Sequence, residues 1–194
     1  MLRTLLVACL ILTLGTASRP PGRKVIVPAN AAKPVGPYSP GILVGDYLYV
    51  SGQGVRDAGG AMPDGIAAQT RQCLENVKAI VEAAGLTLEH VVHMQLYLER
   101  MSDFAEVDRV YAGYFPAAPP ARVVVGVAKM PTETTVEMTA VAVRDSKLKK
   151  PLALKSLAPP GHASPAVAVG DRIYLSAAYG KNPAEAERSL KLAL

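Results

Sequence analysis

Apolar and polar positions follow two periods along the chain, and these periods predict the elements. Residues 42–51, ILVGDYLYVS, alternate beyond the turn residues Gly45 and Asp46, and they predict two strands or one bent strand around that turn. Residues 91–98, VVHMQLYL, alternate throughout, and this predicts a strand with one solvated or interfacial face. Residues 134–143, TTVEMTAVAV, predict the last strand of the domain.

Two segments have the spacing of amphipathic helices. In the first, apolar residues recur at helical spacing between Asp64, a good N-cap, and Gly85, a good stop. In the second, Ser102 is the predicted cap, and Phe104 and Tyr111 belong to the apolar stripe. The order strand, strand, helix, strand, helix, strand, strand predicts an α+β fold, a mixed sheet with two helices packed on one face.

One predicted strand begins with a charge. In PPARVVVGVAKMP, residues 119–131, Arg122 precedes an apolar run typical of a strand that is buried on both faces. A guanidinium keeps its charge, and removing it from water costs on the order of several kcal/mol unless an anion pairs with it. The partner is either a carboxylate of the protein or a carboxylate that arrives as a ligand. Glu137, in the last strand, is the candidate within the protein, as a buried structural ion pair or as part of a site.

Length and charge narrow the class of protein. The 194 residues are half hydrophobic, enough for one ordinary domain and an additional segment. Only 19% are charged, too few for a disordered chain. Part of the net charge of +5 comes from lysines in a predicted linker, residues 145–160. Such a run is usually solvated, so we expect no nucleic-acid partner. These lysines are Lys147, Lys149, Lys150 and Lys155.

The first residues have the pattern of a secretory signal peptide, predicted over residues 1–18. Arg3 precedes an apolar run at residues 5–14, and small residues follow. The run is short for a membrane span, which needs about 20 residues, so an uncleaved anchor is the only membrane contact we consider. We expect a secreted or periplasmic protein, with a cytoplasmic location as the alternative. Cleavage removes Cys9 and leaves Cys73, which we interpret as a packing residue on a helix.

Several motifs in the same order resemble those of the RidA family, also called YjgF/YER057c/UK114. The resemblance covers residues 25–144 and implies a chorismate-mutase-like fold that forms a trimeric barrel, with ligand sites in the clefts between subunits. It also implies hydrolysis of reactive 2-imino or enamine acids to 2-keto acids and ammonia, without a cofactor. The motifs are GPYSP at 36–40, SGQ at 51–53, ARVVVGVAKMP at 121–131 and VEMTAVAV at 136–143.

The resemblance also implies roles for particular residues. Arg122 is similar to the family arginine that binds the substrate carboxylate, and Glu137 to the acid that positions and activates the attacking water. Tyr38, Ser51 and Gly52 are similar to residues that line the pocket.

Three further residues are assigned to substrate binding by the same resemblance. Val123 and Val124 lie on the arginine strand, and the backbone of Val124 is similar to the acceptor for the imine nitrogen. Asp108 stands where asparagine is common in the family. A carboxylate there would repel an anionic substrate and narrow or weaken its binding.

The proposed chemistry suits these residue types. A guanidinium holds a planar carboxylate through two parallel hydrogen bonds, which a lysine cannot do. The imine carbon is already electrophilic, so a positioned water and a carboxylate suffice. His90 and His93, three residues apart on a predicted strand, point to opposite faces and do not predict a metal pair. The alternative is a non-catalytic trimer that binds small carboxylates or acts as an interaction scaffold.

The C-terminal part of the chain repeats an earlier segment. SPAVAVGDRIYLS, residues 164–176, resembles SPGILVGDYLYVS, residues 39–51, so that each residue corresponds to the one 125 positions earlier. We interpret residues 161–194 as a truncated second RidA-like unit, with a chance hairpin as the alternative. This unit has no equivalent of Arg122 or Glu137, so it cannot perform the chemistry. It must dock on the first unit, pair with another chain or stay partly disordered.

Overall fold

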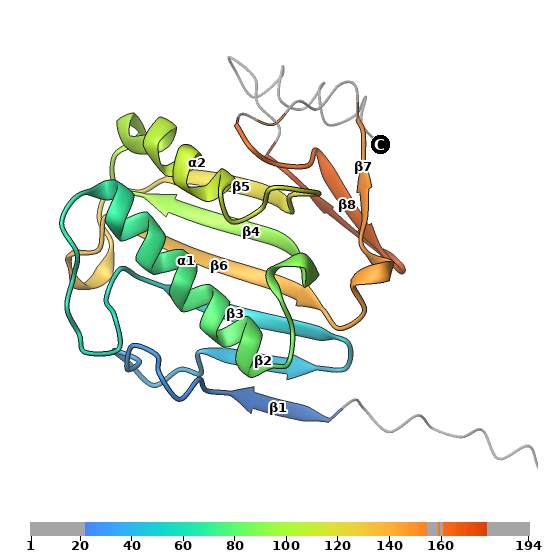
Figure 1. Ribbon diagram of the computed structural model, residues 1–194, viewed down its shortest axis with the longest axis horizontal. Coiled ribbons are helices and arrows are strands. Elements are labelled where there is room, and N and C mark those ends of the chain that lie inside the picture. Colours follow the sequence, from blue (N-terminus) through green and yellow to red (C-terminus); the bar gives the residue numbers. More distant parts are fainter. Residues whose placement is uncertain (1–21, 155–158, 160, 178–194) are drawn as a thin grey trace, which may run out of the picture.

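The computed structural model describes residues 22–154, 159 and 161–177, which form two β-sheets and two α-helices (Figure 1). The predicted signal peptide, residues 1–18, lies outside the described residues. So do residues 178–194, the end of the predicted second unit. The signal peptide stays a prediction.

The larger sheet has six strands in the order β1-β2-β3-β6-β4-β5. All neighbouring strands are antiparallel except β4 and β5, which are parallel, so the sheet is mixed as predicted. The strands are β1 (Arg23–Ile26), β2 (Gly41–Val44), β3 (Tyr47–Gln53), β4 (Val91–Leu98), β5 (Ala121–Gly126) and β6 (Val136–Val143).

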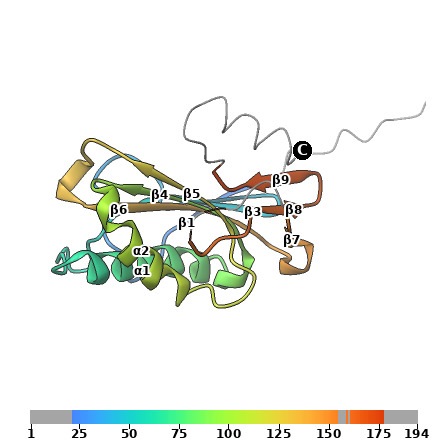
Figure 2. The ribbon, with the colours of Figure 1, turned by 90° about the horizontal axis from the view of Figure 1, so that it is seen from above.

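Both α-helices cover the same face of this sheet. Helices α1 (Ile66–Ala83) and α2 (Phe104–Ala112) lie together below the sheet when it is seen edge-on (Figure 2). Their apolar stripes pack on alternate residues of the strands, which confirms the predicted α+β fold. Trimer formation stays a prediction. Short 3₁₀ turns occur at Leu88–His90, Met101–Asp103, Pro131–Glu133 and Ser146–Leu148.

Cys73 packs inside this core, as predicted. Its thiol is fully buried and donates a hydrogen bond to the carbonyl of Val136, with 3.2 Å between sulfur and oxygen. Burial, and secondarily the charge of Glu137, raise the pKa of the Cys73 thiol well above its ordinary value.

The helix starts differ from the predictions. The N-cap of α1 is Gly65, with φ of 78°, so the prediction of Asp64 as the cap is wrong. A left-handed residue at this point sets the entry angle of the chain, which composition does not reveal. Ser102 lies inside a 3₁₀ turn, and Asp103 is the N-cap of α2. Gly85, with φ of 78°, follows the end of α1 as predicted.

The strand that begins with Arg122 is not buried on both faces. β5 is the last strand of the sheet and has only β4 as a neighbour within it. Val123 and Val124 are half-buried, Gly126 is exposed, and only the first two residues are buried. The continuous apolar run is therefore part of an edge strand. The later residues of β5 have no covering layer in the described part of the chain.

β4 also separates the two residues proposed as an ion pair. Arg122 aligns with Met94 on one side of β4, and Glu137 aligns with Tyr97 on the other. Two strand spacings put their backbones roughly 10 Å apart across the sheet. Alternation along the strands also points Arg122 to the helix face and Glu137 to the opposite face. The proposed Arg122–Glu137 pair is therefore wrong.

The smaller sheet comes from the C-terminal region and has three antiparallel strands in the order β7-β8-β9. They are β7 (Lys150–Leu152), β8 (Ala166–Val169) and β9 (Arg172–Leu175). This sheet lies against the larger one near β5 and the start of β4 (Figure 1). The predicted linker, residues 145–160, therefore contains a strand.

Candidate functional site

A cavity of about 310 Å³ opens where β3 and β6 meet the loop before β2. Tyr38, Ser51, Gly52 and Glu137, which were predicted as site residues, all line it. Tyr38 comes from the loop, Ser51 and Gly52 from β3, and Glu137 from β6. Tyr38 is 44% exposed and forms part of the rim.

Glu137 lies directly over Gly52. A Cβ atom on Gly52 would collide with the Glu137 carboxylate, so the position requires a glycine if this carboxylate is to stay where it is. Burial raises the pKa of the Glu137 carboxyl above its usual value. A carboxylate with a raised pKa accepts a proton from water more readily near neutral pH.

The wall around Ser51 is fixed by hydrogen bonds. The Ser51 hydroxyl donates to the carbonyl of Pro40 at 3.0 Å. The amide of Gln53, itself 8% exposed, donates to the carbonyl of Ser51 at 3.1 Å and to that of Gly52 at 3.1 Å. These bonds hold two carbonyls and a hydroxyl at the mouth of the cavity, where they can orient a water molecule.

The cavity also holds polar residues that the sequence did not indicate, among them Lys33, Arg56 and Asn76. Lys33 and Arg56 line it together with Glu137 and supply positive charge. Asn76 donates to the carbonyls of Gly54 and Arg56 at 2.9 and 2.8 Å and so fixes the loop after β3. A polar residue inside the apolar stripe of α1 was the signal that could have revealed Asn76.

Arg122 and Asp108 form a second centre, on the helix side of β5. Nη2 of Arg122 lies 2.7 Å from Oδ1 of Asp108, and the side chain of Arg122 is 1% exposed. The guanidinium carbon stands 4.4 Å from the ring centre of Tyr111 and 5.6 Å from that of Phe104. The internal partner of Arg122 is therefore Asp108, supported by two aromatic faces.

The C-terminal segment covers this second centre. The backbone N–H of Arg122 donates to the hydroxyl of Ser176 at 2.8 Å, and its carbonyl accepts from the N–H of Ala177 at 3.3 Å. Oδ1 of Asp108 accepts a hydrogen bond from the N–H of His162 at 2.9 Å. Backbone groups two residues apart on a strand point the same way, so those of Val124 also face this edge.

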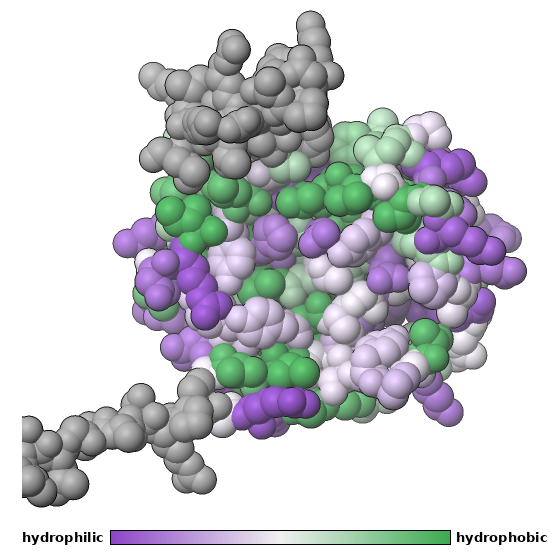
Figure 3. Space-filling view, turned by 180° about the vertical axis from the view of Figure 1, so that it is seen from behind, coloured by the Kyte–Doolittle hydropathy of each residue, from purple (hydrophilic) through white to green (hydrophobic). Residues whose placement is uncertain are grey.

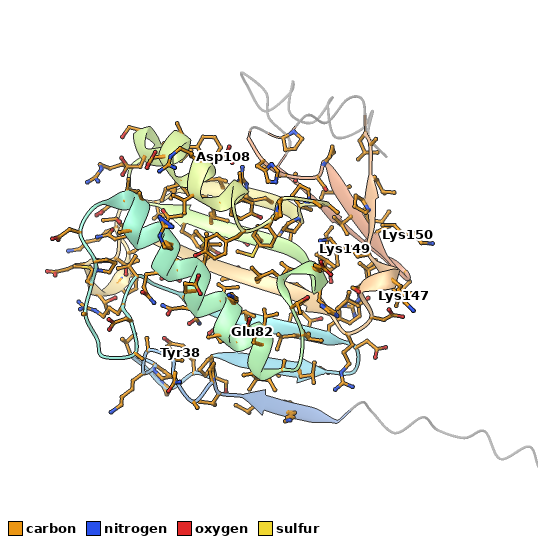
Figure 4. All side chains as sticks on the ribbon, in the orientation of Figure 1. Tyr38, Glu82, Asp108, Lys147, Lys149 and Lys150 are labelled. Atoms are coloured by element: carbon orange, nitrogen blue, oxygen red, sulfur yellow. The ribbon has the colours of Figure 1, made fainter. Side chains whose placement is uncertain are left out.

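The predicted site residues thus fall into two groups that do not meet within one chain. Tyr38, Ser51, Gly52 and Glu137 share the cavity, whereas Arg122, Asp108, Val123 and Val124 lie on α2 and β5. Figure 4 shows Tyr38 and Asp108 on opposite sides of the domain. Each group can contribute one half of a carboxylate-binding hydrolytic site, Arg122 the cation and Glu137 the base.

The described residues include no group of three or more histidine, cysteine, aspartate or glutamate side chains placed to hold a metal ion. No helix in this part of the chain has both the length and the apolar character needed to cross a membrane.

The fold and the cavity define a small α+β domain with a carboxylate-containing site for a small molecule. A family model described as Endoribonuclease L-PSP matches residues 28–144, more than half of the chain. The chain belongs to this family, the RidA/YjgF family that its motifs resemble.

The alignments with this domain cover nearly the whole length of each relative. A RutC family protein of Pyrococcus horikoshii is 44% identical over 125 residues, which are 63% of this chain and 99% of the relative. A 2-iminobutanoate/2-iminopropanoate deaminase of Escherichia coli is 42% identical over 125 residues, 62% of this chain and 98% of the relative. The crystal structure of E. coli TdcF with bound serine matches with a TM-score of 0.61 and 36% identity, over 63% of this chain and 99% of TdcF. Relatives named as deaminases support a RidA-type hydrolase function.

Proposed function

We propose that this protein hydrolyses reactive 2-imino and enamine acids to 2-keto acids and ammonia. The observation that carries the proposal is the Glu137 carboxylate, whose pKa is raised by burial, in a cavity with Ser51, Gly52 and two cations. The relatives named 2-iminobutanoate/2-iminopropanoate deaminase support the same class of reaction.

In the proposed reaction, the substrate enters as a protonated imine beside a carboxylate. Glu137 takes a proton from water while the water oxygen bonds to the imine carbon, and the C=N π electrons return to nitrogen. Glu137 then returns the proton to nitrogen. The hydroxyl of this intermediate next gives its proton to Glu137, which is again a carboxylate, as C=O forms, and the C–N bond breaks with its electron pair on nitrogen. Ammonia leaves, and water has been consumed without any change in oxidation state.

We further propose that Arg122 of one copy binds the carboxylate of a substrate held in the Glu137 cavity of another copy. Two observations support this assignment. Arg122 and Glu137 are separated by β4 within one chain, and the neighbour of the Arg122 backbone is Ser176, which corresponds to Ser51 of the cavity. An assembly of copies, the homotrimer that the family resemblance implies, would bring the two halves together.

A coupled assay tests this function. An amino-acid oxidase generates 2-iminopropanoate from alanine, and the rate of keto-acid release is followed with wild type, Glu137→Gln and Arg122→Ala. We expect losses of about 10²- to 10⁴-fold for Glu137→Gln. Glu82→Gln, at an exposed position on α1 (Figure 4), is the control and should retain wild-type activity. Release that is no faster than in buffer, both by the wild type and by a chain that ends at Asp145, would refute the deaminase proposal.

The alternative function, a non-catalytic trimer that binds small carboxylates or serves as a scaffold, is favoured by one observation. Asp108 already pairs with Arg122 at 2.7 Å, which opposes turnover of anionic substrates. Calorimetric titration with 2-ketobutanoate separates the alternatives: binding without any deaminase activity selects the non-catalytic protein.

We also propose that the protein is exported, on the basis of the N-terminal pattern described above. Mass measurement of the protein recovered outside the cytoplasm tests this: the mature chain should lack about the first 18 residues. Recovery of only the full-length chain, in the cytoplasm, contradicts export.

A further inference from the structure

The two sequence repeats fold into the same hairpin. In β2–β3 the paired residues run from Gly41 with Val50 to Val44 with Tyr47, and in β8–β9 each pair is the one 125 positions later. Left-handed glycines occupy both turns, with φ of 56° and 58° at Gly45 and Gly170. The hydrogen bond that closes each hairpin is also shared, at 2.9 Å from Ser51 N to Pro40 O and from Ser176 N to Pro165 O.

The second hairpin is docked on the first domain. Val167 and Val169 are 0 and 1% exposed and form an apolar cluster with residues of the larger sheet, separate from the main core. These residues are Val92, Ala121 and Val143. Ser164 and Ser176 also reach the edge of β5, through a parallel bridge to Ala121 and the hydrogen bond from Arg122 N–H. The docked hairpin therefore both buries apolar surface and covers an open strand edge.

Within the described residues, the same face of the first hairpin is covered only in part: on β3, Tyr47 donates to the carbonyl of Val169 at 3.4 Å and the Tyr49 hydroxyl accepts from Arg172 at 2.9 Å. Ile42 and Val44 correspond to Val167 and Val169 and point away from the core, yet both remain half-exposed. The face of the molecule turned away from the helices carries several hydrophobic patches (Figure 3). The chain thus contains one hairpin whose apolar residues on β2 stay half-exposed, and one surface that already receives a hairpin of that kind.

We propose that the β8–β9 hairpin occupies, within its own chain, the surface on which the β2–β3 hairpin of a second copy docks. As long as the chain's own hairpin is docked, this surface is closed to other copies and self-association is blocked. The occupant that replaces it is the β2–β3 hairpin of a second copy, because that segment has the same strand register and the same apolar positions.

The exchange would change the Arg122 centre, a consequence that rests on the proposed function. Ser51 and Gly52 of the second copy would take the places of Ser176 and Ala177, and Glu137 of that copy would arrive beside Gly52. The docked C-terminal hairpin brings no equivalent acid, so the closed form has an incomplete site.

The exchange would also release Asp108. In the closed form the N–H of His162 binds the Asp108 carboxylate at 2.9 Å. The corresponding residue of the first repeat is Pro37, and a proline has no N–H to donate. The segment before the C-terminal hairpin therefore holds Asp108 beside Arg122 through this hydrogen bond, which Pro37 of a second copy could not form.

Light scattering after size-exclusion chromatography tests the proposal on the full-length chain at tens of micromolar. We expect wild type to be monomeric and Val167→Asp to self-associate, because a buried carboxylate undocks the hairpin. Ile173→Asp is the matched control: it puts the same charge on the same hairpin at a residue that is 58% exposed, and it should stay monomeric.

Two further chains keep the test decisive. A chain that ends at Asp145 retains the whole domain to which the relatives align over 98–99% of their length, and it should self-associate without any mutated residue. The double variant Val167→Asp, Ile42→Asp should return to monomer, since Ile42 lies on the incoming hairpin. A wild type that is already assembled, a monomeric chain ending at Asp145, or a double variant that still associates would each overturn the proposal.

The deaminase assay on the same samples separates this proposal from the proposed function. Association of the chain ending at Asp145 together with at least a tenfold higher rate on 2-iminopropanoate supports both. Association without any deaminase activity supports the docking proposal and refutes the deaminase function. Activity of a chain that stays monomeric refutes the docking proposal alone.

Discussion

Oδ1 of Asp108 lies 2.7 Å from Nη2 of Arg122, so the cation expected to bind a substrate carboxylate already has an anion of the protein beside it. The guanidinium also lies between two aromatic rings, which hold it in place. A substrate carboxylate must therefore displace Asp108 or share Arg122 with it. Where Arg122 binds the substrate carboxylate, as proposed, competition with Asp108 lowers the affinity for anionic ligands.

Replacing Asp108 by asparagine tests this competition. We expect Asp108→Asn to lower KM for 2-iminopropanoate on the order of tenfold, equivalent to about 1.4 kcal/mol, with little change in kcat. The melting temperature should fall, because the buried guanidinium loses its counter-charge. Glu106→Gln, which breaks the exposed pair with Arg109 on the same helix, is the control and should change neither quantity. An unchanged KM in Asp108→Asn contradicts the assigned role.

Glu137 should make stability depend on pH. Burial raises its pKa above the usual 4.5, so the folded chain binds this proton more tightly than the unfolded chain. The stability that this bound proton contributes is fully present below the pKa of Glu137 in the unfolded chain. It is lost as the pH rises through the pKa of Glu137 in the folded chain. Glu137→Gln should therefore match wild type in free energy of unfolding at pH 4 and exceed it at pH 7. Urea titrations at both pH values check this. Equal free energies of unfolding for wild type and Glu137→Gln at pH 7 would show that burial does not destabilise the carboxylate.

Gly52 should tolerate no side chain without loss of activity. The Cβ of alanine would displace the Glu137 carboxylate, which is the mobile end of its side chain, so the fold should survive. Misplacement of a catalytic group by about 1 Å costs about a hundredfold, and we expect a loss of kcat of that order in Gly52→Ala. Gly22→Ala, where nothing lies within 4 Å of the new Cβ, is the control. Full activity of Gly52→Ala would show that Glu137 is not required in its present position.

Cys73 should report on global unfolding. Its thiol is buried and its pKa is raised, so little reactive thiolate is available in the folded state. In a Cys9→Ser background, a thiol reagent should label Cys73 only as urea unfolds the chain, with the same midpoint as circular dichroism. Rapid labelling without urea would show that α1 opens locally.

Local features of the fold could be read from the sequence. Alternation over residues 91–98 predicted β4 with its observed ends, and the stop at Gly85 was also correct. These features depend on a few neighbouring residues, because each strand or helix must present its apolar side to one core. The start of α1 could not be read in this way, since Gly65 adopts a left-handed conformation that the surrounding loop imposes.

The candidate site was only partly readable. Residue identity and the family motifs indicated Arg122 and Glu137, but the order of strands decided which residues they meet. β4 enters between β5 and β6, and so Arg122 meets Asp108 on α2. Pairing between distant strands depends on the packing of the whole domain, which periodicity along the chain does not encode.

By itself, the sequence determined the family, the two helices on one face, the candidate site residues and the repeat of residues 39–51 at residues 164–176. Only the tertiary structure decided that the repeat folds back against the β5 edge and covers the Arg122 centre. The physical reason is that an amphipathic hairpin must bury its apolar face. Which surface it covers depends on contacts between segments far apart in the sequence.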